Sequence, residues 1–228
     1  MKSLVRSFVP AVVAVAAVAS FASAAPETLR IDPNHSIAGF SIRHFFARVQ
    51  GRFTELDGRL TWDAAAPAQS SVDVTIPAAS ITTQNETRDK DLRSDNFFDV
   101  AKYPTVTFKS TKVELAEGKT TLAEGDKFKV YGDLTMKGVT RPVVLDATFN
   151  GSGQVAIGGT KMGTVTGFEA TTTINRKDWN ILWNKNLDSG GTLLGDDVTI
   201  NLEVEATTPR QSAEGAKKAA DTKAADRK

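Results

Sequence analysis

Few residues of this chain are of a type that carries out chemistry. The 228 residues include two histidines, His35 and His44, and no cysteine. Thiol catalysis, a cysteine-bound zinc site and disulfides are therefore excluded. Ser36 directly follows His35, which is a poor geometry for a Ser–His–Asp triad, and the chain has no G-x-S-x-G sequence. The sequence thus predicts no catalytic residues and indicates a protein that is not an enzyme.

The sequence also predicts no metal site and no cofactor. His35 and His44 lie at opposite ends of one expected strand, up to ~30 Å apart when extended, so they cannot share an ion. Asp188, Asp196 and Asp197 flank a glycine-rich loop but lack the spacing of an EF-hand. The small number of reactive side chains favours a binding function over a catalytic one.

Strands are the elements that must position any site, because apolar and polar residues alternate through most of the chain. The expected strands cover residues 37–44, 49–53, 58–63, 72–76, 105–110, 127–137, 143–149, 167–174 and 198–206. If residues 48–62 form one long bent strand, the count is about eight. Strands with one apolar and one polar face are typical of antiparallel sheets. The pattern predicts an all-β sandwich or an eight-stranded antiparallel up-and-down barrel, with a short helix near 86–98.

The two ends of the chain differ from this region. Residues 1–24 resemble a secretory signal peptide, with a basic start, an apolar stretch and a small-residue cleavage site after Ala24. Residues 207–228 contain no Leu, Ile, Val or aromatic residue, which predicts a disordered basic tail. The folded domain is then expected to cover residues 25–206.

The charge and the apolar stretches limit the class of partner. The chain has a net charge of +1, but the basic residues of the two ends leave the expected domain at −4. A domain of that charge is a poor nucleic-acid binder. The apolar stretch near the start is shorter than the ~20 residues of a spanning helix, so no stable membrane insertion is expected. A homodimer remains open.

Several segments, in order along the chain, resemble the YceI-like family of exported bacterial proteins. The segments that carry the resemblance are Asp32-Pro33-Asn34-His35-Ser36, Phe40–His44, Val49–Phe53, Arg88–Val100, Lys102-Tyr103-Pro104, Gly132–Val143 and Gly167–Arg176 with Trp179. They cover nearly the whole expected domain. The family often has His at the position of Asp91 and Asp at that of Asn96, so this chain departs from the pattern at both positions.

The resemblance implies a lipocalin-like barrel in the periplasm that binds a polyisoprenoid or similar amphiphilic lipid, for transport, storage or sequestration. It supplies no catalytic residue. By side-chain direction, the candidate ligand-binding residues are Phe40, Ile42, Phe53, Trp62, Phe108, Phe128, Leu134, Met136, Phe168 and Trp179. The candidate headgroup contacts are His35, His44, Arg88 and Asn175.

Three alternatives stay open at this point. One is an enzyme that acts on a small amphiphile by carboxylate acid/base chemistry, for which the sequence assigns no residues. The candidate headgroup residues fit structural roles equally well, such as an Arg88 ion pair with Asp89 or Asp99, or an asparagine that caps a turn. An eight-stranded barrel is also narrow enough for its side chains to fill it. The protein would then be a non-catalytic interaction module with a solid core, which binds a partner through its surface or tail.

Overall fold

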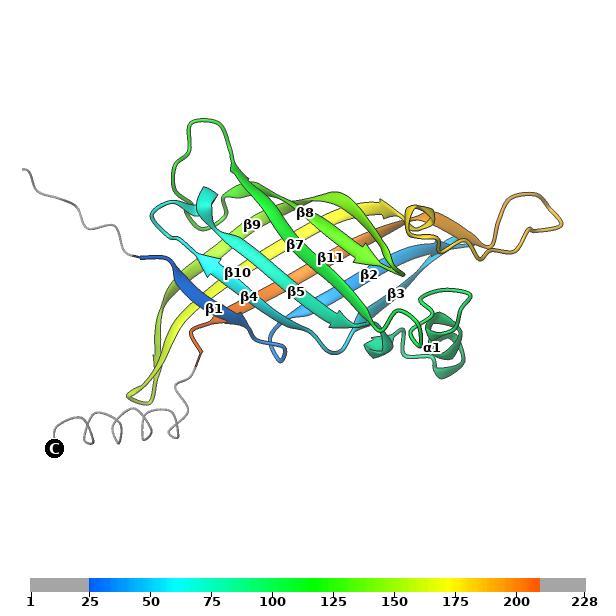
Figure 1. Cartoon of the computed structure of the whole chain (residues 1–228), viewed down its shortest axis with the longest axis horizontal. Coiled ribbons are helices and arrows are strands. Elements are labelled where there is room, and N and C mark those ends of the chain that lie inside the picture. Colours follow the sequence, from blue (N-terminus) through cyan, green and yellow to red (C-terminus); the bar gives the residue numbers. More distant parts are fainter. Residues whose placement is uncertain (1–24, 210–228) are drawn as a thin grey trace, which may run out of the picture.

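The alternation of apolar and polar residues produces a closed antiparallel barrel in the computed structural model, which describes residues 25–209 (Figure 1). Its strands are β1 (Glu27–Ile31), β2 (Ile37–His44), β3 (Ala47–Phe53), β4 (Asp57–Trp62), β5 (Ser71–Pro77), β6 (Ile81–Thr82), β7 (Thr105–Leu115), β8 (Lys127–Met136), β9 (Val139–Ile157), β10 (Thr160–Asn175) and β11 (Leu194–Thr207). The helices are α1 (Glu86–Arg93) and the short 3₁₀ turns η1 (Pro67–Gln69), η2 (Ala78–Ser80) and η3 (Arg176–Trp179).

Strand β11 closes the barrel. One edge of β11 pairs with β10, and its other edge pairs first with β2 and then, at Ala206 and Thr207, with β1. Strands β1 and β2 are thus two halves of one strand that is interrupted at residues 32–36. Strands β3 and β4 are likewise two halves of one bent strand, and β5 and β6 form a third. Counted in this way, the barrel has the eight antiparallel strands that the sequence predicts, and closure excludes the sandwich.

Two apolar clusters form the core. The first surrounds Trp62, whose ring stacks on Phe149 at 5.4 Å and meets the edge of Phe168. The second surrounds Met136 and Trp179. Most residues of both clusters come from the apolar faces of neighbouring strands, because successive side chains of a strand point to opposite sides of the sheet. In the second cluster, Ala78 comes from η2 and Trp179 from η3.

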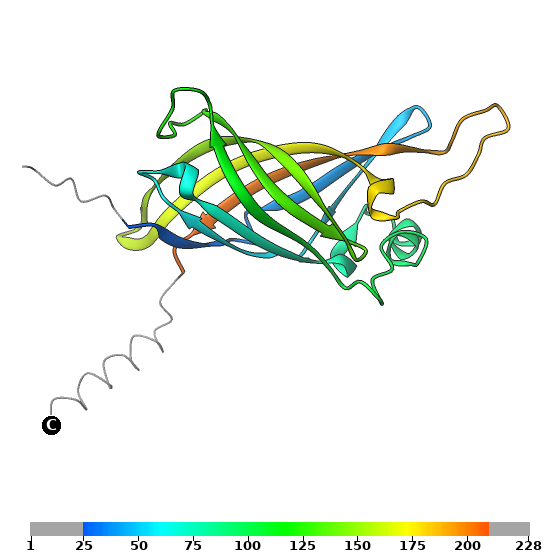
Figure 2. The same ribbon diagram turned by 45° about the horizontal axis from the view of Figure 1, so that its top comes forward.

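Helix α1 lies beside one end of the barrel (Figures 1 and 2). Asn85 caps it by accepting a hydrogen bond from the backbone N–H of Arg88 at 3.0 Å, as expected. The helix ends at Arg93 rather than near residue 98. Ser94 has an extended backbone, and its hydroxyl donates to the carbonyl of Asp91 at 2.6 Å, so the last turn is satisfied without further helix.

The fold extends slightly beyond the expected domain boundary at 206. Thr207 belongs to β11, and the backbone N–H of Thr208 donates to the carbonyl of Thr164 at 3.0 Å. The expected signal peptide, residues 1–24, and residues 210–228 of the expected tail lie outside the described residues. Within residues 25–209, no helix has the length and apolar character needed to cross a bilayer.

Candidate functional site

The interior of the barrel contains two adjoining apolar cavities of about 140 and 120 Å³. The residues that line both cavities are Ile31, Val74, Phe108, Leu145, Leu202 and Val204. Phe108 is the largest of these residues, and it lies where the two cavities meet. A cavity of about 150 Å³ lined by Leu, Ile and Phe stays dry and binds benzene. Each compartment therefore has the size and chemistry to hold a small hydrocarbon group.

Two glycines keep aromatic rings against the barrel wall. A Cβ on Gly51 would lie 2.9 Å from a ring carbon of Phe40, its partner across the β2–β3 pair. A Cβ on Gly132 would lie 2.5 Å from a ring carbon of Phe108. Real Cβ atoms do not approach so closely, so the two rings occupy space that any other residue would fill. The rings cover the wall, and the centre of the barrel stays open.

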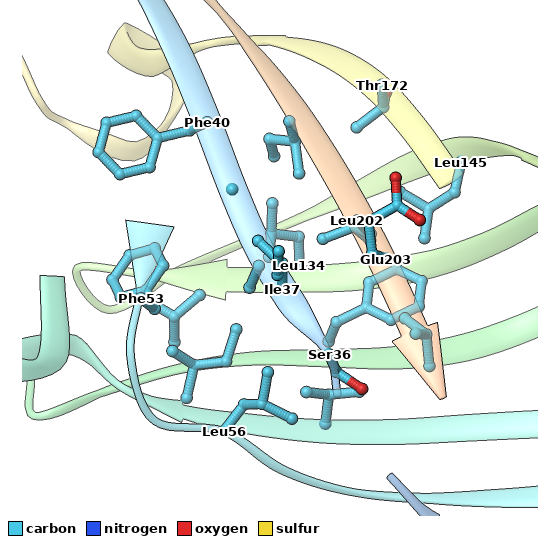
Figure 3. Close-up of a pocket in the computed structure, with 18 of the residues that line it drawn as sticks. Ser36, Ile37, Phe40, Phe53, Leu56, Leu134, Leu145, Thr172, Leu202 and Glu203 are labelled. Carbon is cyan, nitrogen blue, oxygen red and sulfur yellow. The ribbon is translucent and has the colours of Figure 1, made fainter. Parts of the chain in front are cut away.

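Polar groups lie at one side of the larger cavity, where β1 breaks into β2. Ser36 and Glu203 reach its lining at this break, and Thr172 lies farther along the cavity, paired with Ile200 of β11 (Figure 3). The backbone N–H of Glu205 donates to the Ser36 hydroxyl at 3.0 Å and fixes its position. Ile37 and Glu203 pair across β2 and β11, line the cavity and are also solvent-exposed. Both side chains alternate with inward residues of their strands, so they lie on the outer face of the barrel at this break.

The carboxyl of Glu203 is held in an unusual setting. Partial burial raises its pKa, and the carboxylate of Glu169, directly opposite on β10, raises it further. Like charges opposed across a strand pair destabilise the ionised forms. The result is a carboxyl group on the outer face of the cavity wall that accepts a proton more readily than an ordinary glutamate.

Eight of the ten candidate ligand-binding residues line one or both cavities. These are Phe40, Phe53, Trp62, Phe108, Phe128, Leu134, Met136 and Phe168. The other two, Ile42 and Trp179, line neither cavity. Ile42 pairs with Val49 and Val198 near the end of β2, beyond the cavity. Trp179 is 2% exposed, and its indole N–H donates to the carbonyl of Leu134 at 3.1 Å, so it supports the wall from outside the cavity.

None of the four candidate headgroup residues lines either cavity. Arg88 donates to the hydroxyl and the carbonyl of Thr83, at 2.7 and 3.1 Å. Asn175 caps η3 by accepting from the backbone N–H of Lys177 at 3.0 Å. The ring of His44 packs edge-on against Phe45. These three residues occupy structural positions, and Arg88 forms no ion pair with Asp89 or Asp99.

His35, the fourth, lies in a polar cluster on the outer surface. Its Nδ1 is 3.1 Å from a carboxylate oxygen of Asp32 and 3.6 Å from one of Glu205. The hydrogen bond to Asp32 and the two negative charges raise the pKa of the imidazole. The three ligand-type atoms lie within 4.8 Å of one another. The sequence pattern did not reveal this cluster, because Glu205 is distant in the chain and reaches His35 only through the β1–β11 pairing.

The segment that carries the most specific family resemblance has a structural role. Asp89, 5% exposed, accepts hydrogen bonds from the Thr82 hydroxyl at 2.8 Å and the Thr83 backbone N–H at 2.7 Å. Asp91 and Asn96, the two positions where the chain departs from the family pattern, contact each other, since the Asn96 amide donates to Asp91 at 2.9 Å. The two departures therefore occur within one hydrogen-bonded pair.

Comparison with known proteins agrees with this geometry. The family model of the YceI-like domain matches residues 29–206. A UPF0312 protein of Photorhabdus laumondii is 41% identical over 163 residues, which cover 71% of this chain and 79% of that protein. The crystal structure of Burkholderia cenocepacia BcnA superposes with a TM-score of 0.64 at 24% identity, over 78% of this chain and 99% of BcnA. A polyisoprenoid-binding domain from Saccharophagus degradans has a TM-score of 0.57 at 18% identity, over 79% and 98%.

Proposed function

Because this chain belongs to the YceI-like family, we propose that it is an exported periplasmic protein that holds a polyisoprenoid or similar amphiphilic lipid inside its barrel, for transport, storage or sequestration. The observation that carries the proposal is the pair of adjoining apolar cavities that meet at Phe108. The structurally similar domain from Saccharophagus degradans is described as polyisoprenoid-binding, which supports the choice of ligand.

The energetics favour a branched hydrocarbon chain. Each cavity has room for a group about the size of benzene, so the two together accommodate about two five-carbon units. Burial of about ten carbon groups contributes ~8 kcal/mol before ordering costs of several kcal/mol. Micromolar affinity is then attainable without a charged contact. A longer lipid requires the Phe108 ring to shift, or part of the lipid to leave the cavity at the break between β1 and β2.

We place the mouth of the cavity at the break between β1 and β2, where polar groups are available for the end of the lipid. Ser36 and Glu203 are among the lining residues at this break. The Ser36 hydroxyl and the Glu203 carboxyl are the polar groups available there to hydrogen-bond with a hydroxyl headgroup. This position replaces His35, His44, Arg88 and Asn175 as the proposed headgroup site. These groups bind and orient, and we assign no catalytic step to them.

Titration with a fluorescent prenyl probe tests the proposal. Met136 lines the larger cavity, and Met136→Trp should fill part of that space while the delipidated protein stays folded. The expected result is a loss of probe affinity of about tenfold or more. Val144→Trp is the matched control, because Val144 is 37% exposed on the outside of the same sheet, next to the lining residue Val143. Its probe affinity should equal that of the wild type.

Two results would overturn the proposal. If the wild type binds no prenyl probe and Met136→Trp unfolds the protein, the barrel behaves as a solid core and the interaction-module hypothesis takes its place. Native mass spectrometry of protein from its own periplasm should show a co-purifying lipid mass. Export is tested separately, since the mature chain should begin at Ala25-Pro26, and a retained Met1 in a soluble pool would contradict it.

A further inference from the structure

The tip of the β2–β3 hairpin exposes two aromatic side chains. Phe46 is fully exposed (105%) and Phe45 is 39% exposed. Exposure of a single apolar residue is ordinary, but two adjacent phenylalanines at a hairpin tip present a compact apolar projection. Nothing within residues 25–209 packs over Phe46.

The same turn carries backbone strain. Phe45 has φ of +49°, in the left-handed region that disfavours bulky side chains. Two-residue hairpin turns normally place Gly, Asn or Asp at such positions. Phenylalanine at this position costs stability relative to glycine, which favours a role for its side chain outside the fold.

The hairpin is also basic. Ile37–Phe53 contains Arg43, Arg48 and Arg52 and no acidic residue, although the barrel as a whole is acidic. Arg43 donates to the Phe45 carbonyl at 3.0 Å, and Arg48 donates to the hydroxyls of Ser41 and Thr199, so both are held beside the tip by neutral acceptors. Exposed aromatic side chains flanked by arginines are typical of interfacial membrane contacts.

A second segment projects from the same end of the barrel. The loop between η3 and β11 extends beyond the barrel alongside the hairpin in both views (Figures 1 and 2). It joins the hairpin through the backbone N–H of Phe45, which donates to Leu193 at 3.1 Å. The loop exposes Leu182 (61%) and places Lys185 over the Trp183 ring. Asp178, Asp188 and Asp197 are the acidic residues of η3, the loop and the start of β11 that form no ion pair within the described chain.

We infer that this end of the barrel docks on an anionic phospholipid bilayer, with Phe45, Phe46 and Leu182 in the headgroup region and the hairpin arginines against lipid phosphates. The same hairpin carries Phe40 and Phe53, which line the larger cavity. Docking would bring that cavity near the membrane surface. The inference goes beyond the proposed function and holds whether or not the cavity is filled.

Vesicle flotation of the mature full-length protein tests the inference. Vesicles of phosphatidylcholine with phosphatidylglycerol should bind the wild type, and pure phosphatidylcholine or high salt should weaken binding. The double variant Phe45→Gly/Phe46→Ser should lose about tenfold or more of the binding. It should also melt at the same or a higher temperature, because glycine relieves the strain at residue 45. Loss of binding then does not arise from misfolding.

The matched control is Ile157→Ser. Ile157 is 68% exposed near the tip of the β9–β10 hairpin, at the opposite end of the barrel (Figure 1), and its replacement should leave vesicle binding unchanged. Equal loss in both variants, or binding that survives the double variant, would overturn the inference. The inference would also be wrong if the wild type does not bind vesicles but self-associates through the hairpin tip, as measured by sedimentation. Prenyl-probe affinity of the double variant should stay at the wild-type value, which separates this test from that of the cavity.

Discussion

At the scale of single residues, Gly132 determines where the Phe108 ring lies. A Cβ at Gly132 would approach the ring at 2.5 Å and the Lys109 carbonyl at 2.7 Å. Gly132→Ala should therefore push the ring into the space between the two cavities. We expect a loss of about 1–3 kcal/mol in unfolding free energy together with weaker prenyl-probe binding. Denaturant melts and probe titration measure the two effects.

Gly153→Ala serves as the control for Gly132→Ala. Gly153 also lies within a strand, but nothing lies within 4 Å of its Cβ position. This substitution should leave both stability and probe affinity near the wild-type values. A Gly132→Ala variant that behaves like Gly153→Ala would show that the Phe108 ring does not depend on the glycine for its place.

His35 provides a second test at this scale. The hydrogen bond to Asp32 and the negative charges of Asp32 and Glu205 raise its pKa above the ordinary 6.5. The folded state thus favours the protonated ring. Its contribution to stability is fully present below pH 6.5 and is lost as the pH rises through the folded-state pKa. The stability difference between wild type and His35→Gln should therefore be larger at pH 5.5 than at pH 8.5.

Nuclear magnetic resonance titration checks the direct cause. The His35 ring should titrate with a midpoint above 6.5, and Asp32→Asn should lower that midpoint because it removes the principal partner. An unchanged midpoint in Asp32→Asn would show that the hydrogen bond does not set the protonation of the ring.

At the scale of elements, a buried carboxylate attaches α1 to the barrel. Burial alone would raise the pKa of Asp89, but the hydrogen bonds from Thr83 and Thr82 outweigh it and hold the pKa below its ordinary value. Arg93, from the same helix, donates to the carbonyls of Ala79 and Ile81, both at 2.7 Å. The helix is therefore a fixed element, with its anchors on the short segment around β6.

Asp89→Ala should lower the unfolding free energy by about 2–4 kcal/mol, because it leaves the donors of Thr82 and Thr83 without their acceptor. The depressed pKa also means that the contribution of Asp89 is present above pH 3.8 and is lost as the pH falls through the folded-state value. The loss measured in denaturant melts should thus shrink in acid. Lys90→Ala, on the exposed side of the same helix, should have little effect; a similar loss there would contradict the assignment.

At the scale of the whole molecule, the last residues of β11 mark where the fold ends. Thr207 pairs with Arg30 and Val165, and Thr208 exchanges hydrogen bonds with Thr164. Removal of residues 210–228 should leave the melting temperature within about 2 °C of the wild type, since that segment has no apolar anchor. Removal of residues 207–228 should lower it by about 3–8 °C. Equal melting temperatures for the two truncations would place the end of the fold earlier.

Local pattern alone determined much of this protein. Strict alternation predicted most of β11, from residue 198 to 206, and eight of the ten candidate ligand-binding residues line a cavity. It failed for the distal halves of β9 and β10, residues 150–157 and 160–166, where glycines and polar residues hide the alternation. In these segments the pairing of β9 with β10 defines the strands. For example, the hydroxyl oxygens of the paired residues Ser152 and Thr166 are 2.7 Å apart.

Only the tertiary structure decided which inward residues border open space. Ile42 is on an apolar face like Phe40, yet it lies beyond the cavity, because alternation specifies a face and says nothing of the position along the barrel. Trp179 lies in η3, outside the strands. The proposed mouth at Ser36 and Glu203 and the cluster of His35 with Glu205 arise from the register of β11 against β1 and β2. Register joins residues about 170 positions apart, and no local pattern contains that information.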